Sequence, residues 1–188
     1  MPIALECRPT LDDGASLALA AGDAVSVSGE LITIRDATAR RLADLAASGQ
    51  PLPVDLAGRV LYAVGPSPAK PGQVVGSAGP TTLERFISYL PFLFRAGVKG
   101  IVAKGELHGD SVGAFRQAGA VYLAAIGGLG ALLGKRVVAA DIVAFPELGP
   151  EAMYRFTVHD FPAVVIIDRH GRNFHEIARA RWARTTPG

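Results

Sequence analysis

Short apolar runs, interrupted by glycine- and proline-rich turns, make up most of the sequence. One of them alternates apolar and polar positions through Val25, Val27 and Leu31, which is typical of strands on either side of a turn at Ser28–Gly29. The other runs are compact and end at turn residues, so they also predict strands. Strands are expected at residues 24–34, 60–64, 100–103, 120–124, 137–145, 156–159 and 164–168, with a hairpin turn at 170–173.

Segments with helical spacing lie between these strands. In residues 36–47, Ala37, Leu42 and Leu45 share one face, and Gly49 ends the helix. Further helices are expected at residues 82–96, 111–117 and 125–133, the last beginning at a glycine pair. The two ends of the chain fall outside the pattern. We expect an extended arm at residues 1–15, ending in a turn at 12–14, and a fraying basic tail at 177–188.

The alternation of strands and helices predicts an α/β fold with a mixed central sheet flanked by helices. No repeat, low-complexity segment or domain boundary interrupts the chain, so residues 1–188 are expected to form one domain. In such sheets, ligands bind beyond the strand ends, where glycine-rich loops meet the starts of helices. The candidate site is therefore sought in those loops.

Composition narrows the function classes. The chain has 188 residues, 49% of them hydrophobic, and a net charge of +2, which favours a folded domain and gives no reason to expect a nucleic-acid partner. Cys7 is the single cysteine, so the chain cannot form an internal disulfide or supply an iron–sulfur cluster alone. The four histidines show no metal-ligand spacing, and we expect no metal site. Lacking a signal peptide and a membrane span, the protein is expected to be soluble and cytoplasmic.

The segment Gly76–Arg85 is the most informative part of the chain. It combines glycines, a proline and hydroxyl residues just before a helical pattern. Thr81 or Thr82 can cap that helix, whose free N–H groups and Arg85 would attract a carboxylate or phosphate. The alternative is an ordinary loop before a capped helix, because glycine-rich turns of this kind are common.

Two more cations stand at predicted strand ends. Arg35 follows the strand that ends at residue 34, and Lys104 follows the strand 100–103. If these ends share one edge of the sheet, Arg35, Arg85 and Lys104 form a pocket for a small dianion. Taken singly, each cation is more often a solvated surface group. No nucleophile elbow or phosphate-binding loop is present, and Gly127-Gly128-x-Gly130 is a weak dinucleotide signal.

Taken together, a series of short motifs resembles the beta subunit of class I, iron–sulfur-dependent fumarate hydratases and L-tartrate dehydratases. The motifs follow the family's order over roughly residues 20–175. They are Gly22-Asp23-x-Val25-x-Val27-Ser28-Gly29, Arg35-Asp36-Ala37, Leu52-Pro53-x-Asp55-Leu56-x-Gly58, Gly65-Pro66-Ser67-Pro68-Ala69-Lys70-Pro71-Gly72, Gly76-Ser77-Ala78-Gly79-Pro80-Thr81-Thr82, Lys104-Gly105, Tyr122-Leu123-x-x-Ile126-Gly127-Gly128, Leu148-Gly149-x-Glu151-Ala152 and Asp160-Phe161-Pro162-Ala163.

This resemblance implies a swivelling α/β domain that works with an alpha subunit, as a heterotetramer, or as a homodimer when isolated. The alpha partner would hold a [4Fe–4S] cluster through three cysteines. The beta chain would bind a small C4 dicarboxylate, for which fumarate and malate are the first candidates. The enzyme would hydrate or dehydrate it reversibly. By motif position, Thr81 would be the catalytic base. The substrate-binding residues would be Arg35, Arg85, Lys104, Thr82 and Gly79.

Some positions depart from the family's pattern. Ala39 stands where a histidine is usual, Phe86 and Ile87 replace a segment that commonly carries an aspartate, and Ala103 stands where many members have glycine. These changes bear on the substrate more than on the fold. The alternatives are an L-tartrate dehydratase or mesaconate hydratase beta subunit, or a non-catalytic anion-binding subunit that has kept the fold.

Overall fold

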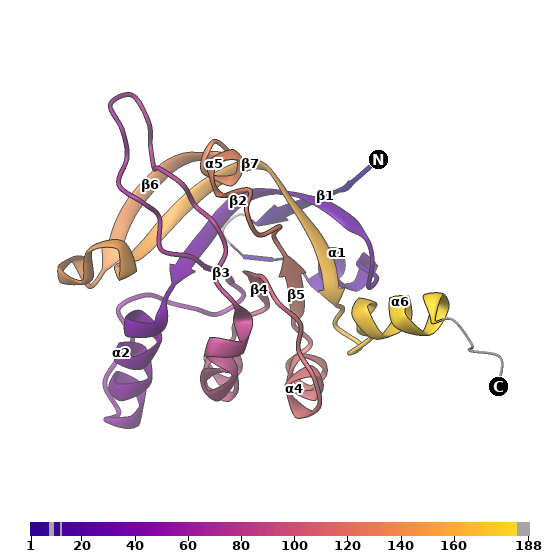
Figure 1. Cartoon of the computed structure of the whole chain (residues 1–188). Helices are drawn as coiled ribbons and strands as arrows, with labels where there is room; N and C mark the ends of the chain where they lie inside the picture. Colours follow the sequence, from indigo (N-terminus) through magenta and orange to yellow (C-terminus); the bar gives the residue numbers. More distant parts are fainter. Residues whose placement is uncertain (8–9, 12, 184–188) are drawn as a thin grey trace.

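The computed structural model describes residues 1–7, 10–11 and 13–183, and within this part of the chain seven strands form one mixed sheet (Figure 1). The order along the sheet is β1-β2-β3-β4-β5-β7-β6, and an additional pairing joins β2 to β7. The strands are β1 (Ile3–Cys7), β2 (Ala24–Ile34), β3 (Val60–Ala63), β4 (Gly100–Ala103), β5 (Val121–Ala124), β6 (Val137–Ala144) and β7 (Met153–Ile167).

The pairing of β2 with β7 closes the sheet on itself. The strands β2 to β5 run parallel, whereas β7 runs antiparallel to both β2 and β5. A closed five-strand circuit results, and β1 and β6 flank it by pairing with the long strands β2 and β7. The predicted α/β class with a mixed sheet flanked by helices is confirmed.

The helical elements gather mainly on one side of the sheet (Figure 1). The elements α2, α3 and α4 lie beneath β3–β5, and α6 extends beside the end of β7. The helices are α1 (Asp13–Ala18), α2 (Asp36–Ala47), α3 (Leu90–Arg95), α4 (Asp110–Ala118), α5 (Gly130–Gly134) and α6 (Phe174–Trp182), with 3₁₀ segments η1 (Leu83–Tyr89) and η2 (Pro146–Glu151). None of the described helices is long and apolar enough to cross a bilayer.

Side-chain alternation along the strands builds two separate cores. On β3, Val60 and Tyr62 belong to a cluster shared with β2, β5 and β7, whereas Leu61 and Ala63 belong to a second cluster. The second cluster also contains Leu42, Phe86, Leu93 and Phe115 from the helical layer. Because both faces of β3 and β4 are buried, these strands are continuous apolar runs rather than alternating ones.

The predicted N-terminal arm is wrong where the structure describes it. Residues 3–7 form β1, which pairs in parallel with β2, and α1 follows at residues 13–18. Arm residues 8–9 and 12, the last at the expected turn, lie outside the described residues. The predicted turn at Ser28–Gly29 is also wrong, since β2 is one strand with a register shift there. Gly29, at φ +112°, permits this because a Cβ would collide with the carbonyl oxygen of Cys7 on β1.

Residues 156–159 and 164–168 were expected as two strands, but β7 is continuous. Asp160 adopts a positive φ of 50°, and its N–H donates to Ser28 Oγ at 3.1 Å. Residues 160–163, which separated the two expected strands and include Asp160 and Pro162, are thus part of β7. Similarly, the helix expected at 82–96 is the 3₁₀ segment η1 followed by α3, where Pro91 removes one backbone donor.

The end of the chain differs from the expectation as well. The hairpin turn expected at 170–173 does reverse the chain and brings Asn173 opposite Ile167 in an isolated antiparallel bridge. The helix α6 follows it in place of a second strand, and the Asn173 side chain caps α6 by accepting the His175 N–H at 3.0 Å. The part of the expected tail at 177–182 is therefore helical, and residues 184–188 lie outside the described residues. The helix expected at 125–133 begins only at Gly130, because Gly128 takes φ +84° in the preceding loop.

Asp168, at the end of β7, is a fully buried carboxylate that holds the final turn. Its oxygens accept the Ala21 N–H at 3.2 Å, the His170 N–H at 3.0 Å, and both the N–H and the Nε of Arg172 at 3.1 and 2.6 Å. Burial alone would raise the pKa of Asp168. The hydrogen bonds from Arg172, Ala21 and His170 outweigh it and hold that pKa below its ordinary value.

We expect Asp168→Asn to lower the free energy of unfolding at pH 7 by about 2–3 kcal/mol, because hydrogen bonds to a buried charge are lost. A carboxylate with a lowered folded pKa stabilises above its unfolded pKa, and the effect fades as pH falls through the folded value. The difference from wild type should therefore shrink between pH 7 and pH 3 in urea titrations. Asp141→Asn, which breaks only an exposed pair with Arg155, should cost under about 1 kcal/mol. A difference that does not change with pH would contradict this account.

Candidate active site at the ends of the parallel strands

The carboxyl ends of β2 to β5 meet at one edge of the sheet because these strands are parallel. Arg35 comes directly after β2 and Lys104 directly after β4. The segment Thr81–Leu83 lies between them and extends the ladder. The Thr81 N–H donates to Ala63 O at 2.7 Å, the Lys104 N–H donates to Thr81 O at 3.0 Å, and the Leu83 N–H donates to Lys104 O at 2.9 Å. The structure thus places the main chain of Thr81 against both the end of β3 and Lys104.

The loop 76–80 that leads to Thr81 is packed tightly on α5. The Ala78 N–H donates to Gly130 O at 2.9 Å, and the buried Tyr62 hydroxyl donates to Ala78 O. A Cβ on Gly130 would stand 3.0 Å from Gly79 N, and a Cβ on Gly134 would overlap the carbonyl oxygen of Gly76. Glycines on the helix therefore allow the backbone of the loop to approach it, which fixes the path of the chain into Thr81.

Neither threonine uses its side chain as a helix cap. Thr82 occupies the position before η1 with φ −73° and ψ 129°, but its hydroxyl makes no capping hydrogen bond. The expectation that a threonine hydroxyl caps this helix is therefore wrong. Thr81 is partly exposed and precedes the cap position. Its hydroxyl is not occupied in capping.

The structure brings Arg35 and Arg85 together through Asp36. Arg85 Nη1 lies 3.2 Å from Asp36 Oδ2, and Arg35 Nε lies 3.7 Å from the same oxygen. The Arg35 side chain is 25% exposed and that of Arg85 is 58% exposed. One carboxylate therefore separates two guanidinium groups that would otherwise repel each other.

Lys104 stands at the same edge of the sheet as the two arginines, but its side chain runs over a different loop. A Cβ on Gly127 would stand 3.4 Å from Lys104 Cδ and 3.8 Å from its Nζ, so the side chain runs over the loop after β5. Among the described residues, no carboxylate that pairs with Arg35 or Arg85 also pairs with Lys104. The three predicted cations thus lie at one edge of the sheet in two parts. Arg35 and Arg85 stand beside Asp36 on one wall, and Lys104 stands beside Gly127 on the other, the lysine wall.

Two carboxylates that sequence reasoning did not single out belong to this edge. Asp36 joins the arginines, and Glu151 Oε1 lies 3.3 Å from Arg35 Nη2. Both stand inside motifs that carry the family resemblance, Arg35-Asp36-Ala37 and Leu148-Gly149-x-Glu151-Ala152. The presence of Asp36 and Glu151 in those motifs was the available signal that they belong to the site. The sequence did not indicate which arginine each of them contacts.

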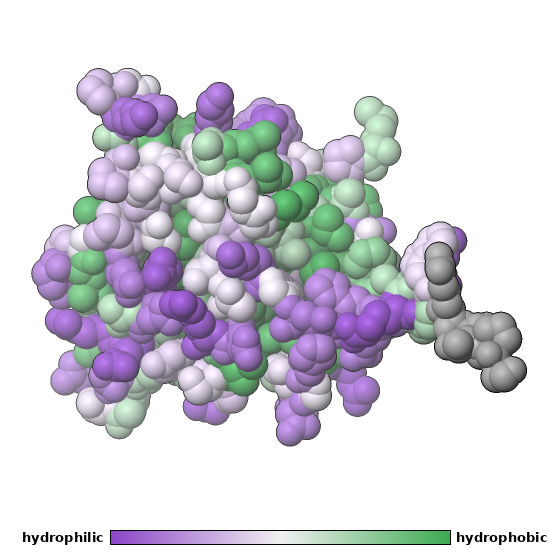
Figure 2. All heavy atoms as spheres, in the orientation of Figure 1, coloured by the Kyte–Doolittle hydropathy of each residue, from purple (hydrophilic) through white to green (hydrophobic). Residues whose placement is uncertain are grey.

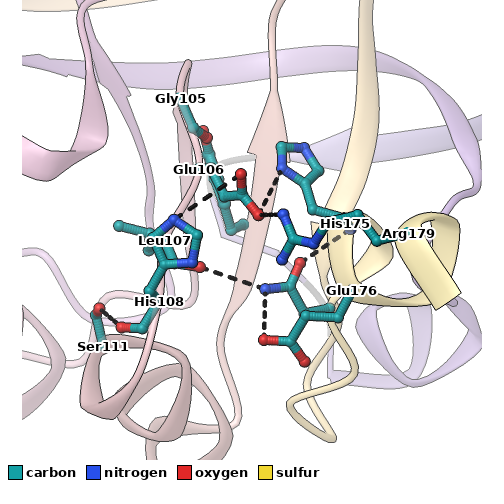
Figure 3. A network of polar contacts seen from close by, with 10 residues as sticks. Gly105, Glu106, Leu107, His108, Ser111, His175, Glu176 and Arg179 are labelled. Carbon is teal, nitrogen blue, oxygen red and sulfur yellow. Dashed lines mark hydrogen bonds and ion pairs between the residues drawn. The ribbon is translucent and has the colours of Figure 1, made fainter. Parts of the chain in front are cut away.

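A second polar network holds the loop that follows Lys104 (Figure 3). Glu106 receives a hydrogen bond from Arg179 of α6, and its oxygens lie 3.6 Å from His175 Nδ1 and 3.8 Å from His108 Nε2. The hydrogen bond from Arg179, together with the charges of Arg179 and the histidines, lowers the pKa of Glu106. The buried Asn173 amide also donates to Leu107 O at 3.3 Å. The C-terminal helix thus ties down the loop beside Lys104.

The departures from the family pattern fall largely in the core. Ala39, Phe86 and Ala103 are buried in the second cluster, and Ile87 is 39% exposed. Ala39 and Phe86 therefore pack beneath the edge and leave the cations of the site in place.

The residues described here do not fit an iron–sulfur cluster. Three thiolates are needed, and the chain has one cysteine. Burial, with a smaller effect from the charge of Glu6, raises the pKa of the Cys7 thiol to about 12, which keeps it protonated. Within the described part of the chain, no group of three or more His, Cys, Asp or Glu side chains is arranged to hold a metal ion.

Exposed apolar side chains lie along the segment that follows β5, where the Lys104 side chain passes Gly127. Ile126, Leu129 and Leu132 are 59%, 39% and 43% exposed, and all lie in or just before α5. Figure 2 shows apolar atoms at the surface around α5, whereas hydrophilic atoms dominate the lower part of the same face. Residues 67–74 are exposed throughout and project above the sheet (Figure 1).

A closed mixed sheet with two arginines, a lysine and a threonine where its parallel strands end defines an α/β protein with three cationic side chains at one edge of the sheet. Residues 8–178 match the family described as Fumarase C-terminus, and the chain belongs to this family. The resemblance inferred from the motifs is thereby confirmed.

Named relatives fall into two groups. Fumarate hydratase 2 of Leishmania major is 35% identical over 156 residues, covering 82% of this chain and 28% of the relative. The anaerobic class I fumarate hydratase of Escherichia coli K12 is 35% identical over 154 residues, covering 81% and 28%. The putative L(+)-tartrate dehydratase subunit beta of Methanocaldococcus jannaschii is 36% identical over 164 residues, covering 84% of each chain. The match thus spans 28% of the length of these two fumarate hydratases.

We expect Gly134→Ala to destabilise the chain by about 1–3 kcal/mol, because the new methyl group forces α5 away from the loop 76–80. Urea unfolding followed by circular dichroism measures the change. Gly113→Ala is the matched control, since Gly113 lies within α4 with open space around it. It should stabilise by about 0.5–1 kcal/mol through helix propensity. Equal behaviour of the two variants would refute the tight contact between helix and loop.

Proposed function

We propose that this chain is the beta subunit of an iron–sulfur hydro-lyase that hydrates and dehydrates a C4 dicarboxylate reversibly, with fumarate and malate as the first candidates. One observation carries the proposal. In a member of the fumarase C-terminus family, Arg35 and Lys104 directly follow two parallel strands, Arg85 pairs with Asp36 next to Arg35, and the main chain of Thr81 is hydrogen-bonded to Lys104. Cations placed in this way suit a small dianion.

The chemistry of the reaction suits this arrangement. Removing a proton next to a carboxylate builds up negative charge on that carboxylate as the transition state forms. The arginines and Lys104 would stabilise the added charge more than the ground state, which lowers the barrier. Thr81 would take the role of base, with its main chain hydrogen-bonded to Lys104 and its hydroxyl not engaged in capping. A neutral hydroxyl is a weak base, so the nearby cations would have to make it more acidic.

The cofactor would come from a partner. Because this chain lacks a set of thiolates, a [4Fe–4S] cluster in the working enzyme would be held by an alpha chain facing the edge. When bound, such a cluster supplies a Lewis acid for the leaving hydroxyl. The exposed Ile126, Leu129 and Leu132 beside the lysine wall support a partner there, since burial of apolar side chains stabilises association. A cytoplasmic heterotetramer is the assembly that we propose, and the isolated chain would form a homodimer.

A specific observation favours L-tartrate as a second candidate substrate. The Methanocaldococcus jannaschii relative, named as a putative L(+)-tartrate dehydratase subunit beta, matches over 84% of both chains, whereas the match covers 28% of each of the two fumarate hydratases. Mesaconate is a further candidate, and an anion-binding subunit without turnover is the remaining alternative. The last is motivated by Ala39, which stands where the family pattern usually has a histidine, and by Phe86 and Ile87, which replace a segment that commonly carries an aspartate.

Anaerobic co-expression with an alpha-like chain that carries three cysteines tests the proposal. We expect turnover that requires both chains and is lost in air, measured by absorbance with fumarate, malate, L- and D-tartrate and mesaconate. The substrate with the highest kcat/KM names the enzyme. A stable, cluster-loaded complex that binds these acids without turnover would overturn the enzymatic assignment and favour the binding role.

In the assembled enzyme, we expect Arg85→Ala to lower kcat/KM by about 10- to 150-fold, which corresponds to about 1.5–3 kcal/mol for a hydrogen bond to a charged group. Arg95→Ala is the control. Arg85 lies near the start of η1, whereas Arg95 is the last residue of α3, at the opposite end of this helical segment. It should change kcat/KM by less than about threefold. Unchanged kinetics for Arg85→Ala would refute a substrate role for Arg85.

A further inference from the structure

Glu151 is joined to both Arg35 and the helix that follows it. Its Oε1 lies 3.3 Å from Arg35 Nη2, while its Oε2 accepts the Ala37 N–H in the first turn of α2 at 2.9 Å. The carbonyl oxygen of Glu151 also accepts a hydrogen bond from the Thr38 hydroxyl. One residue therefore fixes the direction of the arginine relative to the helix start.

This contact follows from the topology of the sheet. Because β7 runs antiparallel to β2, with Ile32 opposite Arg155, the start of β7 lies beside the end of β2. Glu151 stands two residues before β7, and Arg35 stands one residue after β2. Thr33 strengthens the junction, because its hydroxyl accepts the Tyr154 N–H at 2.8 Å. The carboxylate thus reaches Arg35 from the end of η2, just before β7 begins.

Arg35 has few other constraints on its direction. Its Nε is buried without a hydrogen-bond partner among the described residues, and the nearest carboxylate oxygen, on Asp36, is 3.7 Å away. Asp36 is already closer to Arg85, at 3.2 Å. On its other side, the guanidinium is packed against Gly65, where an added Cβ would stand 3.0 Å from Nη1. Without Glu151, the charge of Arg35 would turn towards Asp36 or into solvent.

The Glu151 pair matters for geometry more than for stability. Both side chains are partly exposed, at 31% and 25%, so solvent screens the attraction. A planar guanidinium, however, grips a carboxylate well only when its fork faces the ligand. A partner fixed to the sheet can hold that orientation before the ligand arrives.

We propose that Glu151 is the positioning residue of Arg35: it orients the guanidinium towards the dicarboxylate, and it contributes to turnover only through Arg35. This inference rests on the proposed function, and it assigns a role to the motif Leu148-Gly149-x-Glu151-Ala152. Glu151 itself does not touch the substrate.

The first test is a double-mutant cycle in the assembled, cluster-loaded enzyme. Glu151→Gln keeps an oxygen that can accept the Ala37 N–H but removes the charge that faces Arg35. We expect kcat/KM to fall by about tenfold or more, with a melting temperature within about 2 °C of wild type. In an Arg35→Ala background the same substitution should change kcat/KM by less than about twofold. If Arg35→Ala turns over too slowly, the cycle is run on the Kd of succinate. Losses that add in the double variant would overturn the proposal.

Glu147→Gln is the matched control. Glu147 lies in the same 3₁₀ segment and pairs with Arg41 at 3.0 Å, away from Arg35. It should leave kcat/KM within about twofold of wild type. A loss as large as that of Glu151→Gln would show that the whole segment, and not the Arg35 contact, determines activity, and would overturn the proposal.

A second test does not depend on turnover and so separates this inference from the proposed function. Phenylglyoxal labels accessible arginines, and peptide mass spectrometry gives the labelling rate at each one in the full chain. Glu151→Gln should raise the rate at Arg35 by about threefold or more, as the guanidinium is released from its partner. The rate at Arg95 should not change. An unchanged rate at Arg35 would overturn the positioning role even if the enzyme proves to be a hydro-lyase, whereas a raised rate in a complex without turnover would support the positioning and reject only the proposed reaction.

Discussion

The antiparallel pairing of β2 with β7 is the constraint on which the rest of the structure depends. It closes the sheet, so that one core forms inside the closed circuit and a second forms under the helices. It also brings together two segments that are far apart in the sequence, because residues that precede β7 meet residues that follow β2. Arg35 therefore receives a carboxylate from a segment more than a hundred residues away, with a 114-residue separation between Ala37 and Glu151.

The positive charges at the edge of the sheet are not all neutralised to the same extent. On one wall, Asp36 and Glu151 accompany two arginines, so the guanidinium groups stay close together without strong repulsion. On the other wall, Lys104 lies beside Gly127 and exposed apolar residues. The charges at this edge therefore differ in kind as well as in place, since the two guanidinium groups are planar forks of donors and the Lys104 ammonium is a compact point charge.

Local patterns predicted local structure well. The helix at residues 36–47 and the strand at 100–103 have the bounds that the sequence indicated, because apolar spacing and flanking turn residues determine both. The strand interruptions at Ser28–Gly29 and Asp160–Pro162 were mispredicted, since pairing with neighbouring strands overrides turn propensity there. The edge location of Arg35 and Lys104 followed from parallel strands. Glu151 could not be found in this way, because its partner depends on the closure of the sheet.

The amide of Asn173 makes the loop beside Lys104 depend on α6. Its oxygen caps α6, while its nitrogen holds the carbonyl of Leu107 in the loop beside Lys104. Arg179, further along the same helix, completes the Glu106 network. A cut in the turn just before Asn173 would therefore keep the residues of all seven described strands and release each of these ties. Proteolysis at that turn would accordingly loosen the loop beside Lys104 without removing any strand of the sheet.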